Sequence, residues 1–139
     1  MTLNNLTDEG AKRVIALLFD NSGSDPYTIP ATWYAALMTV AGGETAASGT
    51  EVAAGDYARV ALTGDLTVVV ATPEGVSNQD GPVNWGTPLV DWGTVVEVRL
   101  YDAATDGTCW FYYTISPGVD CDADIPALVP TDGWLQAAA

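Results

Sequence analysis

The stretch VDWGTVVEVRLYDAATDGTCWFYY, Val90 to Tyr113, decides the fold class. It contains two runs of β-branched and aromatic residues, separated by a turn rich in Asp, Thr and Gly. Such runs favour strands, and a short polar turn ending in Asp-Gly joins strands into a hairpin. The sequence therefore predicts an antiparallel hairpin with strands at Val95 to Asp102 and Thr108 to Ile115.

The first of these strands alternates between two faces, because successive side chains of a strand point in opposite directions. The core face is expected to carry Val96, Val98 and Leu100. The opposite face is expected to carry Val95, Glu97, Arg99 and Tyr101. On that face Glu97 and Arg99 would form an exposed ion pair that adds little stability.

Strand-like runs recur along the rest of the chain about every 8 to 14 residues, separated by turns. We expect further strands at Ala31–Val40, Tyr57–Leu62, Leu66–Ala71, Val83–Val90, Ile125–Val129 and Trp134–Ala137. A turn is expected at 63–65 and a polar connection at Pro73–Pro82. This rhythm is typical of a mainly β fold, an antiparallel β-sandwich or jelly roll. With 139 residues, 48% of them hydrophobic, we expect a single domain over 1–139, with the sandwich over about 29–137.

One helix is expected at the start of the chain, over about 7–19. Thr7 can cap it, and Asp8 and Glu9 then lie at the positive end of the helix dipole. Its apolar stripe consists of Ala11, Val14, Ile15, Leu18 and Phe19. Such a helix covers one end of a sheet or binds a partner, and the first arrangement is favoured.

The composition is strongly acidic, with 18 Asp and Glu against 4 Lys and Arg, a formal net charge of −14. This charge repels phosphate, so we expect no nucleic-acid partner and no binding to anionic membranes. The chain shows neither a signal peptide nor an apolar run long enough to span a membrane. The expectation is synthesis in the cytoplasm.

The sequence displays no recognisable catalytic chemistry. Histidine is absent, and no nucleophile elbow, P-loop or dinucleotide-binding turn occurs. A glycosidase pair such as Glu51 with Asp56 would lie in a Gly/Ala loop without apolar surroundings to raise a pKa. We therefore expect neither an enzyme nor a cofactor.

The segment DCDAD contains the carboxylates Asp120, Asp122 and Asp124. It resembles the start of a calcium-binding EF-hand loop, but Ile125 and Thr131 stand where Gly and Glu are needed. A solvated loop without a metal is favoured over a weak calcium site.

Cys109 and Cys121 could form a disulfide, although reduced thiols are the commoner state in a cytoplasmic product. The five tryptophans could form a sugar platform, but core or interface positions are favoured.

Three blocks of sequence carry a family resemblance. They read PATWYAALMT (Pro30–Thr39), GTEVAAGDYARV (Gly49–Val60) and DWGTVVEVRLYDAATDG (Asp91–Gly107). The chain resembles a family of small tailed-bacteriophage proteins with the blocks PATLYVALFT, GTEVSGGSYARV and DWGTVTHFALFDAATGG in the same order. Members are commonly labelled tail fibre or virion structural proteins. The resemblance implies a structural role in a virion and no catalysis.

Three functions are compatible with these observations. The leading hypothesis is a capsid decoration (cement) subunit on the outer surface of the virion, which binds the major capsid protein or other virion subunits and stabilises the shell. The alternative is a tail-fibre or spike adhesin that binds host surface glycans. The third is a cellular sandwich domain with an unrecognised enzyme site.

We also expect a homo-oligomer, because small virion proteins act through repetition. The segment TCWFYY sends large rings to both faces of its strand, which is more than one small core needs. The candidate interface consists of Tyr101, Trp110, Phe111, Tyr112 and Tyr113. Alternatively, the helix over Thr7–Phe19 covers that face within one subunit.

Overall fold

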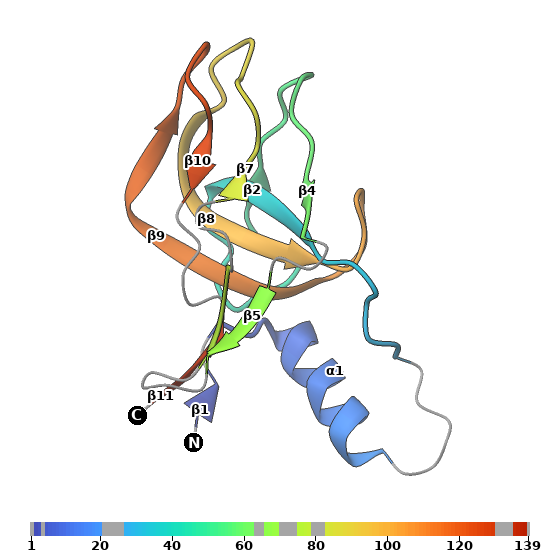
Figure 1. Ribbon diagram of the computed structural model, residues 1–139. Helices are drawn as coiled ribbons and strands as arrows, with labels where there is room; N and C mark the ends of the chain where they lie inside the picture. The colour runs from blue at the N-terminus through green and yellow to red at the C-terminus, as the bar shows by residue number, and fades with distance from the viewer. Residues whose placement is uncertain are drawn as a thin grey trace.

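The computed structural model describes residues 2–3, 5–20, 27–62, 66–69, 75–78, 83–129 and 135–138. It is mainly β and antiparallel with one N-terminal helix, as the sequence predicts (Figure 1). The elements in chain order are β1 (Thr2–Leu3), α1 (Asp8–Phe19), β2 (Tyr34–Val40), β3 (Thr50–Glu51), β4 (Val60–Ala61), β5 (Leu66–Val69), β6 (Gly75–Asn78), β7 (Val83–Asn84), β8 (Gly93–Tyr101), β9 (Cys109–Cys121), β10 (Leu128–Val129) and β11 (Leu135–Ala138).

The largest sheet is built around the predicted hairpin. Its strand order is β3-β2-β8-β9, and β4 also pairs with β2. The hairpin of β8 and β9 turns through residues 102–107, where Asp106 and Gly107 have φ of 53° and 70°. These positive values suit the Asp-Gly pair, since Asp tolerates the left-handed region and Gly adopts it freely.

The apolar core lies mainly on one face of this sheet. The buried cluster includes Ala35 and Leu37 of β2, Val98 and Leu100 of β8, and Trp92 from the loop before β8. Trp85 also belongs to it, and its indole N–H donates to the Ala35 carbonyl over 3.2 Å. The core therefore closes between β2, β8 and the loops that follow β7 and β3.

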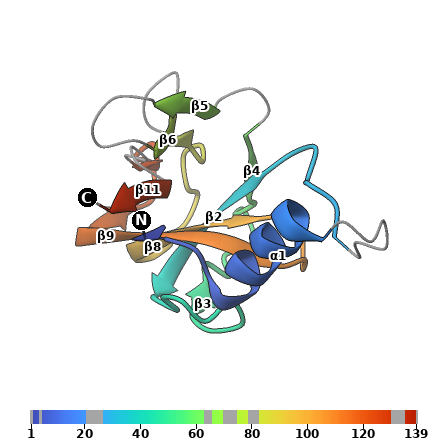
Figure 2. The ribbon, with the colours of Figure 1, turned by 90° about the horizontal axis from the view of Figure 1, so that it is seen from below.

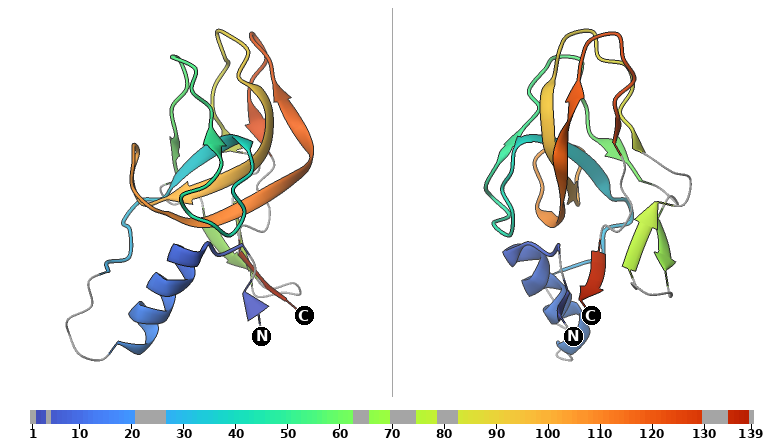
Figure 3. Two further views of the ribbon diagram at one scale, coloured as in Figure 1. Left: turned by 180° about the vertical axis from the view of Figure 1, so that it is seen from behind. Right: turned by 90° about the vertical axis from the view of Figure 1, so that its left-hand side faces the viewer.

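Two smaller antiparallel sheets complete the fold. One has the strand order β1-β11-β6-β5, and the other pairs β10 with β7. The pairing of Thr2 with Ala138 brings the two termini together. Figures 1 and 3 show the termini and α1 at one end of the molecule, with the loops after β3, β7 and β9 at the opposite end.

The predicted helix is confirmed at both its residues and its cap. The Thr7 side chain accepts a hydrogen bond from the Gly10 N–H over 3.0 Å, and Asp8 and Glu9 lie in the first turn. Gly10 is the buried residue of the helix, and a Cβ at this position would overlap the backbone carbonyl of Trp110. Figure 2 shows α1 beside β9, so only a glycine permits this close approach of helix and strand.

Several strand boundaries differ from the prediction. The Pro73–Pro82 segment, expected as a connection, contains β6, while Val83–Val90 is a strand only at β7. The second hairpin strand continues beyond Ile115 to Cys121. Only Leu128–Val129 is extended in the predicted Ile125–Val129 strand. The predicted turn at 63–65 and Trp134 lie outside the described residues.

The predicted assignment of faces in β8 is wrong in two respects. Val95, not Val96, joins Val98 in the core cluster, because the pairing with β9 shifts register between Val95 and Glu97. An irregularity of this kind interrupts the strict alternation of faces. In addition, Glu97 and Arg99 are fully buried rather than exposed.

Candidate functional site

The buried pair of Glu97 and Arg99 holds the loop over residues 41–49 against the sheet. The Arg99 Nε donates to the Glu97 Oε1 over 2.6 Å, and both side chains are 0% exposed. The Glu97 carboxylate also accepts from the Gly42 and Gly43 N–H groups over 3.1 and 3.0 Å. Both charges are therefore compensated inside the protein, as buried charges require.

The remaining donors of Arg99 bind backbone oxygens of the same loop. They reach the carbonyls of Gly43, Thr45 and Ala46 over 2.9 to 3.2 Å. The loop in turn holds the base of α1, because the Asp8 carboxylate accepts from the Ala46 N–H over 2.9 Å. This hydrogen bond is the main cause of the lowered pKa of Asp8.

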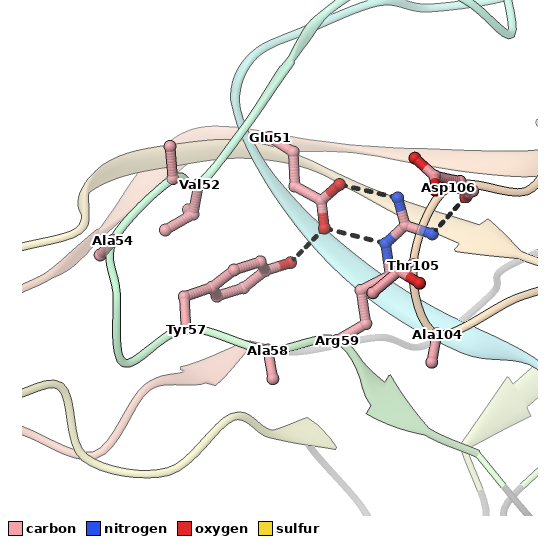
Figure 4. A pocket seen from close by; sticks show the side chains of 10 residues that line it. Glu51, Val52, Ala54, Tyr57, Ala58, Arg59, Ala104, Thr105 and Asp106 are labelled. Atoms are coloured by element: carbon pink, nitrogen blue, oxygen red, sulfur yellow. Dashed lines mark hydrogen bonds and ion pairs between the residues drawn. The ribbon is translucent and has the colours of Figure 1, made fainter.

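A second arginine ties two of the family blocks together (Figure 4). The Arg59 Nε and Nη2 donate to the Glu51 carboxylate over 2.9 and 2.8 Å, and the Tyr57 hydroxyl donates to the same carboxylate over 2.9 Å. The Arg59 Nη1 reaches the carbonyls of Ala103 and Asp106 in the hairpin turn. We call this group, Glu51, Tyr57 and Arg59, the arginine clasp.

The clasp also reaches the core and the predicted interface. The Tyr57 hydroxyl accepts from the Leu37 N–H over 2.8 Å, and burial raises the pKa of this phenol well above its ordinary value. The guanidinium of Arg59 lies 3.6 Å from the ring centroid of Tyr101. Tyr101 is thus a partner of the clasp within one chain.

The clasp forms one wall of an open pocket of about 390 Å³. The lining residues are Glu51, Val52, Ala53, Ala54, Tyr57, Ala58, Arg59, Ala104, Thr105 and Asp106. Arg59 is the cation of this lining, and its donors already bind Glu51 and the turn. The pocket therefore suits a neutral or cationic group better than an anion.

The aromatic residues of β9 lie in different environments. Trp110 is 2% exposed, donates its indole N–H to Asp102 over 3.1 Å and has Arg13 of α1 over its ring. Phe111, Tyr112 and Tyr113 are partly buried. At Trp110 the helix packs against the strand within one subunit, and the role of the five aromatic residues in an interface stays a prediction.

The loop end opposite α1 is built around Asp56. Its carboxylate accepts from the Leu89 N–H over 2.5 Å and from the Trp92 indole N–H over 3.0 Å. These two bonds lower the pKa of Asp56, the Leu89 bond most. Asp91 similarly accepts from the Ala123 N–H. Asp56 is therefore a loop-fixing group, and Glu51 is bound to Arg59, so neither supports the glycosidase pair.

The cysteines and the carboxylates of the DCDAD segment were the remaining candidate groups in the sequence. Cys109 and Cys121 are free and lie at the two ends of β9, too far apart for a disulfide. Asp120 accepts from the Thr94 hydroxyl over 2.5 Å. Among the described residues, no three His, Cys, Asp or Glu side chains are grouped to hold a metal. No described helix is long and apolar enough to cross a membrane.

The tryptophans described do not form an exposed platform. Trp85, Trp92 and Trp110 are buried, and Trp33 packs edge-on against Trp110 and Phe111.

The arginine clasp was not predicted from the sequence, although the sequence contains a signal for it. Glu51 and Arg59 have opposite charges in a chain with only four cations, and both lie in the sequence block Gly49–Val60.

Comparison with known proteins identifies the family. The model of the family described as podophage GP4 fiber I protein gp80 matches residues 5–120. The match extends from the residues before α1 to the last residue but one of β9 and includes all three sequence blocks. A search of curated proteins finds no match. The family match covers well over half of the chain, and the chain therefore belongs to the podophage GP4 fiber I protein gp80 family.

Proposed function

We propose that this chain is a structural subunit of a fibre on a tailed-phage virion. The observation that carries the proposal is the fibre-family match over residues 5–120. The alternative of capsid decoration, favoured by the sequence hypothesis, receives no such support. The expectation that the chain has no catalytic activity remains part of the proposal.

The use of charge in the structure supports a structural role. Arg59 and Arg99 each bind a carboxylate and several backbone carbonyls, and Arg13 binds Asp102 and Thr108. These three of the four cations of the chain hold loops and the helix in place. A fibre subunit needs such loop rigidity, because it must keep its shape while exposed on a particle.

The test is the number and location of copies on purified virions. Quantitative mass spectrometry against the major capsid protein should give a small number of copies per particle, and gold-labelled antibody should bind at the fibres. Hundreds of copies spread over the head would replace the fibre proposal by the decoration hypothesis. Absence of the chain from purified particles would refute both.

Glycan binding is a second candidate, and the observation that favours it is the 390 Å³ pocket beside the arginine clasp. Its carboxylate and hydroxyl groups can accept hydrogen bonds from a neutral sugar. Binding of the purified chain to an array of neutral and acidic glycans tests this role. Neutral glycans should bind, and the double variant Asp106→Asn with Thr105→Ala should lower their affinity. Selective binding of acidic glycans would contradict a pocket for neutral sugars.

A further inference from the structure

The helix α1 is held to the body of the protein through its N-terminal half. Thr7 donates its hydroxyl to the Cys109 carbonyl over 2.6 Å, and Gly10 packs on Trp110. Arg13 adds bonds to Asp102 and Thr108. Beyond these residues the helix extends away from the main sheet, as the two views of Figure 3 show.

The C-terminal half of α1 exposes three large apolar side chains. Ile15 is 59% exposed, Leu18 69% and Phe19 74%. Their spacing of three and four residues places them on one face of the helix, which we call the α1 face. A 12-residue helix is marginal by itself in water, so a helix that protrudes with an apolar face is expected to be stabilised by packing against a partner.

Charge indicates what that partner is. The helix contains Asp8, Glu9, Lys12 and Arg13 and has no net charge, so the formal charge of −14 resides entirely outside it. Most of the rest of the surface therefore has an acidic excess to distribute, and two copies that meet where carboxylates are gathered repel each other, which opposes association. Two copies that meet through α1 bury apolar surface on a helix whose own charges balance, with Asp20 at its end as the adjacent exposed carboxylate.

A second group of exposed apolar residues in the described part of the chain lies among acidic side chains. Leu89, Val90 and Ile125 are 77%, 53% and 57% exposed at the loop end. The exposed carboxylates of Asp91, Asp122 and Asp124 accompany them in these loops. Self-association at the loop end would therefore confront carboxylates with carboxylates, and the loop end serves as a matched control.

We propose that α1 packs against α1 of a second copy of this chain and buries Ile15, Leu18 and Phe19 of both. This interface differs from the predicted one on β9, and it does not depend on where the chain is located in a virion. Its test can therefore fail while the proposed function holds, and the reverse is also true.

The experiment compares two triple variants of the purified chain by sedimentation velocity across a range of concentrations. The first variant replaces the apolar side chains of the α1 face by glutamine, which is a good helix former: Ile15→Gln, Leu18→Gln and Phe19→Gln. Leu89→Gln, Val90→Gln and Ile125→Gln remove the loop-end group. The wild type should exceed the monomer mass of 14.5 kDa, the α1 variant should raise the dissociation constant by more than roughly a hundredfold, and the loop-end variant should match the wild type.

A cysteine variant keeps the proposal testable if the triple variant fails to fold. Phe19→Cys should form an intermolecular disulfide under mild oxidation, whereas Val90→Cys should not, and both native thiols are buried. A wild type that stays monomeric at about 100 μM overturns the proposal. Dissociation by the loop-end variant also overturns it, because a contact between α1 and the loop end would then be head-to-tail.

Discussion

Replacing Glu97 by Gln tests whether the buried ion pair holds the 41–49 loop. Gln preserves the shape of the side chain but removes the charge that balances the Arg99 guanidinium. Its amide NH2 group would also face the N–H donors of Arg99 and the loop, to which it cannot form a hydrogen bond as a donor. The Glu97 carboxylate accepts from Arg99 and from two loop N–H groups, and neither partner is exposed. Breaking a buried pair of this kind costs about 3 to 5 kcal/mol, so we expect this loss in the free energy of unfolding.

The loss should have a local signature as well as a global one. Arg99 holds the carbonyls of Gly43, Thr45 and Ala46, and Ala46 donates to Asp8 at the base of α1. We expect faster hydrogen exchange at the Ala46 amide in the variant than in the wild type. Urea unfolding measures the global free energy, and exchange followed by mass spectrometry measures the local one.

A double variant separates the charge from the hydrogen bonds. Glu97→Leu with Arg99→Met leaves no bare charge, and the exposed loop can turn its backbone groups to water, so the double variant should lose less than Glu97→Gln alone. Glu9→Gln is the control, because its pair with Lys12 is exposed and the loss of that pair should leave the free energy of unfolding nearly unchanged. A cost of Glu97→Gln under about 1 kcal/mol, or a double variant that is less stable than the single one, would show that the buried pair does not hold the loop.

Three further predictions concern the helix contact, the cysteines and acid stability. Gly10→Ala should destabilise the fold by about 1 to 3 kcal/mol although Ala has the better helix propensity, because the added Cβ overlaps the Trp110 carbonyl. Gly55→Ala has open space around the added Cβ and should be nearly neutral in the same urea titration. Burial raises the pKa of Cys109 to about 12 and also raises that of Cys121, so neither native thiol should react with a thiol reagent at about pH 8, and rapid labelling before unfolding would contradict the burial. The pKa of Asp56 is lowered, so its charged form stabilises the fold above the ordinary pKa of 3.8, and this stability is lost as pH falls through the lowered pKa. The urea midpoint of Asp56→Asn should therefore depend less on pH between about 5 and 2 than the midpoint of the wild type. Equal pH dependence in the two proteins would exclude this role.

The sequence predicts the elements better than it predicts their surroundings. The hairpin of β8 and β9 and the helix cap at Thr7 follow from local chemistry, namely β-branched runs, an Asp-Gly turn and a capping hydroxyl. The burial of Glu97 and Arg99 does not. It depends on the 41–49 loop folding back over the strand, and nothing in the alternation of β8 indicates which loop covers that face.

The error at Val95 and Val96 has a similar origin. Period-2 alternation assumes an unbroken register, but the partner of β8 shifts between Val95 and Glu97. The number of extra residues in β9 decides the shift, and these residues lie about 20 positions further along the chain. Local sequence patterns carry no information on such a pairing, so face assignments hold only up to the nearest bulge.

The arginine clasp joins the three sequence blocks that carry the family resemblance. Glu51, Tyr57 and Arg59 all lie in the second block, and the carbonyls that Arg59 binds lie in the hairpin turn of the third. The Tyr57 hydroxyl also binds the Leu37 N–H in the first block. One guanidinium and one phenol thus join all three blocks, which are distant in sequence. The polar groups of Glu51, Tyr57 and Arg59 are thus engaged in contacts that fix the loops in one arrangement.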